Sequence, residues 1–191
     1  MRQPAVLLLL IALCLPACAA GTGPASEPAP QTTPISRIRT PLPADATPTR
    51  TTIYLPRYFE DGSLGLRGVD RIVASDQPAR RALEAFIQGP DGAERAADLN
   101  YPLSPRTGIV SFDLANEIAT IEFGPELAEV RGRPFSELAY WSIVYTLTEV
   151  PGVRGVSLVR SGQPLREFGF PPVPIPAVAT RADAPSWVAP R

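Results

Sequence analysis

The sequence predicts a single small α+β domain in which two main helices pack on a mostly antiparallel sheet. Residues 77–88 and 134–150 repeat apolar side chains at helical spacing. Shorter stretches alternate apolar and polar residues, as half-buried strands do, and turn residues separate them. All of these signals fall within residues 51–170, and a stretch of roughly 120 residues suffices for one hydrophobic core. One domain is therefore the expected organisation.

The first expected elements are two strands. Thr51 to Leu55 is a short run of β-branched and aromatic residues, and Pro56 and the Asp61-Gly62 turn close it. Val69 to Ala74 alternates well enough to form a second strand.

A helix follows these strands. Ser75 or Asp76 is expected to be its N-cap, and Pro78 lies in its first turn. Gly89-Pro90 ends the helix by supplying a left-handed cap and then a residue that cannot continue it. One face at helical spacing is expected to be buried: Ala79, Ala82, Leu83, Phe86 and Ile87.

Two alternating stretches, residues 109–114 and 118–123, are expected to form a hairpin. A turn at Asn116-Glu117 would place Leu114 opposite Ala119. In this register the apolar residues of both arms share one buried face: Val110, Phe112, Leu114, Ala119, Ile121 and Phe123.

Pro134 to Val150 is the longest expected helix. Tyr140, Trp141 and neighbouring residues extend its apolar surface around most of the circumference. Such a helix is either buried on two sides or uses its second face to bind a partner, and the sequence leaves both alternatives open. Gly155 to Arg160 and Leu165 to Phe168 are then expected to form a closing hairpin.

Composition removes several classes of chemistry. All 18 basic residues are Arg, there is no His, and the formal net charge is −1. Catalytic triads with His, lysine Schiff bases and His-ligated zinc are therefore excluded. A nearly neutral chain also lacks the basic footprint that nucleic acid requires, so no nucleic-acid partner is expected. Neither a cofactor nor a metal site is expected.

Carboxylate acid–base chemistry is still open to this composition. In the expected hairpin, Asp113 and Glu122 are diagonal neighbours on the polar face, and glycoside cleavage uses two acids about 5 to 9 Å apart. A cell-wall glycosidase that uses this pair is the alternative to a non-catalytic binding role. Arg131 and Arg133, in the loop before the long helix, either contact an anionic polymer or are solvated loop charges.

The N-terminal segment has the features of an export signal. Arg2 precedes an apolar run from Ala5 to Leu15, which is shorter than the roughly 20 residues of a membrane span. The run ends at Leu15-Pro16-Ala17-Cys18, which resembles the lipobox of bacterial lipoproteins, where the signal is cut before the Cys and the Cys is lipidated. Residues 1–17 are thus expected to be a lipoprotein signal peptide and Cys18 the lipidation site. An ordinary cleaved signal that leaves Cys18 as a free thiol is the alternative.

Two Pro-rich stretches flank the predicted domain. Residues 18–50 show no apolar period and are expected to be a tether between the membrane and the domain. Residues 171–191 are expected to be a disordered or loosely docked tail, in which Trp187 either folds back on the domain or meets a partner.

Three strings carry a family resemblance: ALEAFIQGP at 82–90, IVYTLTEVPGVRGV at 143–156, and Ser161-Gly162-Gln163-Pro164. Together with the order of elements over residues 51–168, they resemble the GerMN domain of sporulation and spore-germination lipoproteins. The resemblance implies an α+β fold on an exported protein and a role as a binding or assembly module. Sporulation does not follow from it.

The sequence therefore predicts an exported, membrane-anchored lipoprotein of the cell envelope with a non-catalytic GerMN-type domain at residues 51–170. Its membrane contact is expected through acyl chains on Cys18. Its partner is expected to be an envelope protein or a cell-wall polymer. The candidate contact residues are Tyr140, Trp141, Arg131 and Arg133.

Overall fold

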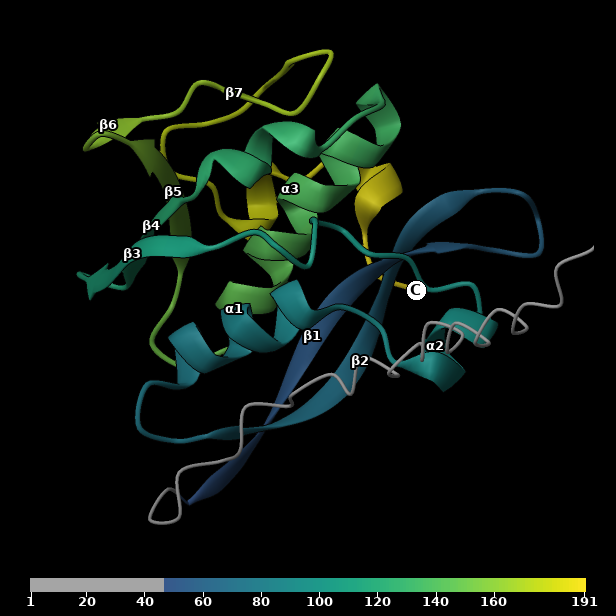
Figure 1. Ribbon diagram of the computed structural model, residues 1–191, viewed down its shortest axis with the longest axis horizontal. Coiled ribbons are helices and arrows are strands. Elements are labelled where there is room, and N and C mark those ends of the chain that lie inside the picture. Colours follow the sequence, from purple (N-terminus) through teal and green to yellow (C-terminus); the bar gives the residue numbers. More distant parts are fainter. Residues whose placement is uncertain (1–46) are drawn as a thin grey trace, which may run out of the picture. The chain divides into compact units, whose positions relative to one another are not determined.

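The computed structural model describes residues 47–191 and has the expected α+β fold (Figure 1). Its first half contains strands β1 (Pro48–Tyr58) and β2 (Leu64–Ala74) and helices α1 (Pro78–Gln88) and α2 (Gly92–Ala96). Its second half contains strands β3 (Ile109–Ala115) and β4 (Ile118–Phe123), the 3-10 helix η1 (Pro125–Glu129), helix α3 (Arg133–Thr148) and strand β5 (Gly155–Arg160). The chain then forms short strands β6 (Gln163–Pro164), β7 (Glu167–Phe168) and β8 (Val173–Pro174) and the 3-10 helices η2 (Arg181–Asp183) and η3 (Ser186–Val188). The predicted signal peptide, Cys18 and most of the predicted tether lie outside the described residues.

The strands form three sheets, and most of their pairs are antiparallel. β1 and β2 make one two-stranded sheet, β3-β4-β5-β6 make a four-stranded sheet in that order, and β7 and β8 make the third. The exception is the parallel pair β4–β5. These strands are parallel because α3 carries the chain back between them as a crossover connection.

The first hairpin is longer than the sequence predicted. The predicted strands at 51–55 and 69–74 lie inside β1 and β2, whose register pairs Ile53 with Val69. Ile53 and Leu55 alternate into the core and are fully buried, as is Leu66 on β2.

Helix α1 buries the five residues that the spacing predicted. Gly89 ends the helix with a φ of 71°, also as predicted. The expected N-cap is wrong: Gln77 occupies that position and its side chain makes no capping hydrogen bond. Asp76 instead accepts hydrogen bonds of 2.9 and 3.2 Å from the guanidinium of Arg81, because that cation lies one turn into the helix.

An ion pair fixes α2 against β2. The guanidinium of Arg71 donates two hydrogen bonds, of 2.7 and 2.6 Å, to the carboxylate of Glu94. The same carboxylate accepts from the backbone N–H of Asp91 in a capping box. Burial alone would raise the pKa of Glu94, but the hydrogen bonds from Arg71 and Asp91 outweigh it and hold the pKa below its ordinary value.

The β3–β4 hairpin has the predicted register, with Leu114 opposite Ala119 and Phe112 opposite Ile121. Both turn residues, Asn116 and Glu117, have positive φ angles, which is the geometry of a tight two-residue hairpin turn.

The prediction that the whole apolar set of this hairpin is buried is wrong for β3. Ile109 pairs with Phe123 and Ser111 with Glu122, so Val110 is the extra residue of a β-bulge. The bulge interrupts the regular alternation that would place Val110 on the same face as Phe112. Val110 and Leu114 are exposed. The physical reason is that β3 is the edge strand of its sheet, while the core covers the apolar face of β4.

The closing hairpin is correct only in its first arm. β6 pairs with β5 through two residues, Gln163 opposite Arg160 and Pro164 opposite Val159. Pro164 has no N–H to donate, and one further bond, from Leu165 N–H to Leu158 C=O, follows it. Residues 167–168 then leave this sheet and pair with β8.

Helix α3 is surrounded by the rest of the described chain (Figure 1). It contacts β1 and α1 from the first half of the domain, and β5, β7, β8 and η2 from the part that follows it in the chain. Every residue from Leu138 to Leu147 is buried. Of the two alternatives for this helix, burial on two sides is therefore correct.

Residues 171–191 pack on the domain, so the prediction of a disordered or loose tail is wrong. Ala179 exchanges backbone hydrogen bonds of 2.8 and 2.9 Å with Val156 of β5, on the edge that β6 leaves unpaired. Val188 is fully buried, and the N–H of Arg191 donates to the carbonyl of Leu66 on β2. The compact domain therefore includes residues 171–191. Trp187 folds back with this segment and stays partly exposed.

Candidate binding surface

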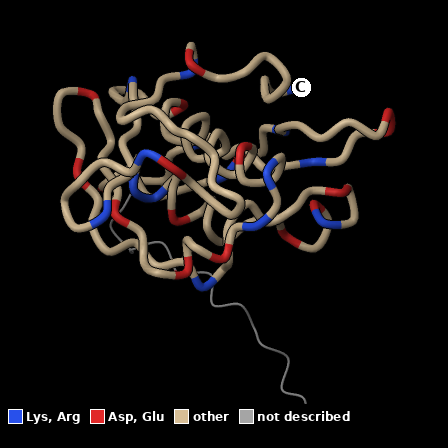
Figure 2. Tube along the Cα trace, turned by 90° about the horizontal axis from the view of Figure 1, so that it is seen from above, with Lys and Arg blue, Asp and Glu red and all other residues tan. Residues whose placement is uncertain are grey.

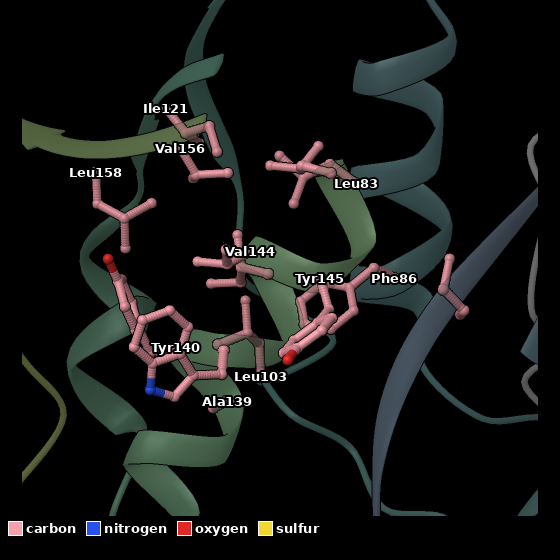
Figure 3. Packing of buried hydrophobic residues seen from close by; sticks show 14 of the residues in the cluster. Leu83, Phe86, Leu103, Ile121, Ala139, Tyr140, Val144, Tyr145, Val156 and Leu158 are labelled. Carbon is pink, nitrogen blue, oxygen red and sulfur yellow. The ribbon is translucent and has the colours of Figure 1, made fainter. Parts of the chain in front are cut away.

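Tyr140 and Trp141 lie in the core and do not form the partner surface that the sequence suggested. They are 2% and 6% exposed. The ring of Tyr140 lies 5.0 Å from that of Trp141 and 5.7 Å from that of Phe168. Figure 3 shows the Tyr140 side chain pointing toward Leu158 of β5. Burial raises the pKa of the Tyr140 hydroxyl far above its ordinary value.

Arg181 holds the C-terminal segment against the end of α3. Its guanidinium donates to the hydroxyl of Thr148 at 2.8 Å and to the carbonyl of Tyr145 at 2.9 Å. It also forms an ion pair with Glu149 and lies over the rings of Tyr54 and Tyr145. The apolar face of α3 that lacked an obvious occupant in the sequence is thus covered by this chain's own C-terminal segment together with β5 and β7.

The carboxylate of Glu149 joins three elements at this point. It accepts hydrogen bonds from Arg181 and from the hydroxyl of Tyr54 on β1. Burial alone would raise the pKa of Glu149, but the hydrogen bonds from Arg181 and Tyr54 outweigh it and lower the pKa.

Arg131 and Arg133 are exposed, as predicted, but they have different surroundings. Arg133 pairs with Glu137 one turn along α3, at 3.3 Å. Arg131 lies over the ring of Phe170, with its guanidinium carbon 5.5 Å from the ring centroid. Phe170 is held there by backbone hydrogen bonds with Val130 and Gly132, and its side chain is 59% exposed.

A hollow of about 420 Å³ opens beside Phe170, between η1 and the segment from the end of β5 to β8. We call it the arginine hollow. Its apolar lining includes Leu127, Leu165, Phe168 and Phe170, and its charged lining consists of Arg160, Arg166 and Glu167.

Arg160 and Arg166 differ from the other arginines of the described chain. Neither guanidinium has a hydrogen-bond, ion-pair or aromatic partner among residues 47–191. Every other arginine in that range contacts a carboxylate, a carbonyl, a hydroxyl or an aromatic ring. Arg160 and Arg166, the two arginines without such a contact, both line the arginine hollow. Figure 2 shows that basic and acidic positions are interspersed along the trace of the described residues.

A second hollow, of about 300 Å³, lies beside the β1–β2 loop. Three of its four charged groups are already engaged: Arg191 pairs with Asp61, and both Arg191 and Arg57 lie over the ring of Phe59. Glu60 is the fourth charged group of this lining. This second hollow leaves less unpaired charge for a ligand than the arginine hollow does.

The acids of the glycosidase alternative are where the sequence placed them. Ser111 is opposite Glu122 and Asp113 is opposite Thr120, so the two carboxylates are diagonal neighbours on one face. Glu122 accepts a hydrogen bond of 2.7 Å from the backbone N–H of Ser161, which ties it to the β5–β6 turn. Neither acid lines either of the two hollows. The carboxylate of Glu122 therefore has a structural partner, and the pair lies outside both of these hollows.

Within residues 47–191, no three side chains of the His, Cys, Asp and Glu types gather in a way that would hold a metal ion. No helix of this part of the chain has the length and hydropathy needed to cross a membrane.

Residues 44–166 match the family model described as "Germane: Sporulation and spore germination". The chain belongs to this family. The match agrees closely with the range 51–168 over which the sequence resembled GerMN domains. No curated protein matches the sequence. The Germane match ends before β7, so the C-terminal segment that covers α3 lies beyond it.

Solved GerMN structures share this fold. The tandem GerMN domains of the sporulation protein GerM from Bacillus subtilis align with a TM-score of 0.58 at 19% identity, covering 72% of this chain and 48% of that one. The first GerMN domain of GerM aligns at 0.55 and 20% identity, covering 71% of this chain and 99% of that one. A candidate lipoprotein from Clostridium perfringens aligns at 0.50 and 19% identity, covering 71% and 89%. This Germane chain thus spans about half the length of the tandem-domain structure.

Sequence reasoning missed Arg160 and Arg166. They sit on either side of a short turn in an unremarkable charge pattern, and nothing local separates them from the paired arginines. They differ from the paired arginines because no carboxylate of residues 47–191 lies within ion-pair distance of them, and only the folded structure shows this. Of the predicted contact residues, Arg131 alone adjoins the hollow, through Phe170.

Proposed function

We propose that this protein is a lipid-anchored, exported binding or assembly module of the cell envelope and that it acts without catalytic turnover. The observation that carries the proposal is the arginine hollow, which offers charge and apolar surface for binding but no paired acids for catalysis. Membership of the Germane family supports a location in the cell envelope, because the description of this family is sporulation and spore germination.

The anchor is the N-terminal part of the proposal. Cys18 follows an apolar run with a small residue immediately before it, as in a lipobox. One acyl chain binds membranes only marginally, so stable anchoring requires at least two chains on or next to this Cys. The structural similarity to a candidate lipoprotein from Clostridium perfringens supports this part.

The anchor is tested by Cys18→Ala in cells that express the full chain. We expect the wild-type protein in the membrane fraction, with incorporated labelled fatty acid, and the variant released from membranes without label. A variant that stays in the membrane fraction contradicts lipid anchoring through Cys18.

The binding role is tested by crosslinking in intact cells, followed by identification of the captured component. We expect one envelope protein or wall component to be enriched in the wild type. The non-catalytic part is tested by incubating the purified protein with cell walls. Release of wall fragments that is abolished by Asp113→Asn or Glu122→Gln contradicts it.

A further inference from the structure

The arginine hollow combines three features that together define a ligand. Two guanidinium groups, those of Arg160 and Arg166, have no partner among the described residues. A third, that of Arg131, stacks on the exposed ring of Phe170 at the rim. Leu127, Leu165 and other apolar side chains complete the lining. Such a site suits an anionic group joined to apolar surface.

Guanidinium groups favour carboxylates and phosphates, because their planar forks donate two parallel hydrogen bonds to either anion. The apolar lining separates these two choices. A phosphate polymer would satisfy the charges and leave the surfaces of Leu165 and Phe170 in water. A peptide that alternates acidic and apolar residues would use both, since burial of apolar surface adds to the ion pairs.

We propose that the arginine hollow is the docking site for an acidic, partly apolar peptide segment of another envelope protein. The proposal rests on the proposed binding function and names the site and the ligand chemistry within it. Arg160 and Arg166 bind carboxylates of the segment, and the ring of Phe170 contacts its apolar side chains. Glu167 is the single acid in the lining and opposes such a ligand.

The site is tested by fluorescence anisotropy with the full lipoprotein in detergent and a labelled hexapeptide of alternating Glu and Leu. The double variant Arg160→Gln with Arg166→Gln should bind this peptide at least tenfold more weakly than wild type. Each substitution removes a guanidinium that donates charge-assisted hydrogen bonds to a carboxylate of the peptide. Glu167→Gln should bind it a few-fold more tightly. Neither the double variant nor Glu167→Gln should lower the free energy of unfolding, because the side chains of Arg160, Arg166 and Glu167 have no partner among residues 47–191 to lose.

The matched control removes the same net charge elsewhere on the surface. Arg50 and Arg154 each form one exposed ion pair, with Asp70 and Glu117 respectively. The double variant Arg50→Gln with Arg154→Gln should bind the peptide within about twofold of wild type, since the exposed charges it removes lie outside the hollow. An equal loss in this control shows a general charge effect and overturns the proposal.

Two further probes decide the ligand chemistry. The same hexapeptide with Gln in place of Glu should bind at least tenfold more weakly than the acidic peptide. Inorganic polyphosphate at equal charge should compete poorly, and tighter binding of polyphosphate than of the peptide overturns the peptide assignment. Absence of peptide binding by the wild type overturns it as well.

A cellular experiment separates failure of this inference from failure of the proposed function. A photo-crosslinking amino acid at Phe170 should capture an envelope protein through an acidic segment, and the same amino acid at exposed Ile72 on β2 should not. If an envelope partner is captured only from Ile72, the binding function stands and the arginine hollow is not its site.

Discussion

Replacing Arg181 with Met removes the contacts that hold the C-terminal segment on α3 while keeping an apolar stem of similar length. The guanidinium is lost from the hydroxyl of Thr148, the carbonyl of Tyr145 and the carboxylate of Glu149. It is also lost from the faces of Tyr54 and Tyr145.

The expected cost is about 3 to 3.5 kcal/mol of unfolding free energy. Each hydrogen bond to Thr148 and Tyr145 contributes about 1 kcal/mol net. The ion pair contributes only about 0.5 kcal/mol, because the side chains of Arg181 and Glu149 are 39% and 34% exposed and solvent screens them. The aromatic contacts add about 0.5 to 1 kcal/mol.

No partner is left buried without a hydrogen bond, which keeps the cost from being larger. Thr148 still donates to the carbonyl of Val144, at 2.7 Å. The carbonyl of Tyr145 still accepts from the N–H of Glu149, and the carboxylate of Glu149 still accepts from Tyr54.

Urea unfolding followed by far-UV circular dichroism measures this loss. With a slope of about 2 kcal/mol per molar urea, the midpoint of Arg181→Met should fall by roughly 1.5 to 1.75 M. The control is Arg154→Met, in which a 78% exposed arginine loses one surface ion pair. Its midpoint should move by less than about 0.3 M. Equal shifts in the two variants would refute the structural role given to Arg181.

The pH dependence provides an independent check on the same contact. Because the folded pKa of Glu149 is lowered, its stabilisation is complete above the ordinary value of 4.5 and is lost as the pH falls through the folded pKa. Arg181→Met should therefore lose less stability than wild type between pH 5 and 3. An unchanged acid slope in the variant would show that Arg181 does not set the ionisation of Glu149.

Three further predictions concern other parts of the fold. Gly169→Ala should destabilise the fold more than Gly152→Ala. Both glycines have a positive φ, but only at Gly169 would a new Cβ collide with another residue, Ser136. The free energies of unfolding in urea should differ by at least about 1 kcal/mol, and equal losses would count against that collision. Glu94→Gln should destabilise the folded protein at pH 7. Because the folded pKa of Glu94 is lowered from its ordinary value of 4.5, the variant should also lose less stability than wild type as the pH falls below 4.5. Measuring the thermal unfolding midpoint against pH checks the sign. Deleting residues 171–191 should uncover part of the core around α3 and increase the binding of an apolar dye. Unchanged dye binding would contradict the burial of that face by the C-terminal segment.

Local pattern was sufficient where a residue's environment depends on its near neighbours. The buried face of α1 follows from a helical period, and its end follows from Gly89. The register of the β3–β4 hairpin follows from a two-residue turn and the alternation on either side of it. The family resemblance carried by residues 82–90 and 143–156 is of the same kind, since these strings encode packing and turns.

Features that depend on residues distant in the chain were decided by the tertiary structure. The apolar circumference of α3 was compatible with a core or with a partner, and β5, β7 and the C-terminal segment settled it by supplying the missing cover. Its prolines space the apolar residues irregularly, so Ala179 and Val188 gave no periodic signal although both are fully buried. The arginine hollow depended on the same kind of information, because a charge is available for a ligand only when no distant carboxylate has been brought to it. Periodicity describes neighbours within a few residues, whereas burial and charge pairing are properties of contacts that the chain makes only after it has folded.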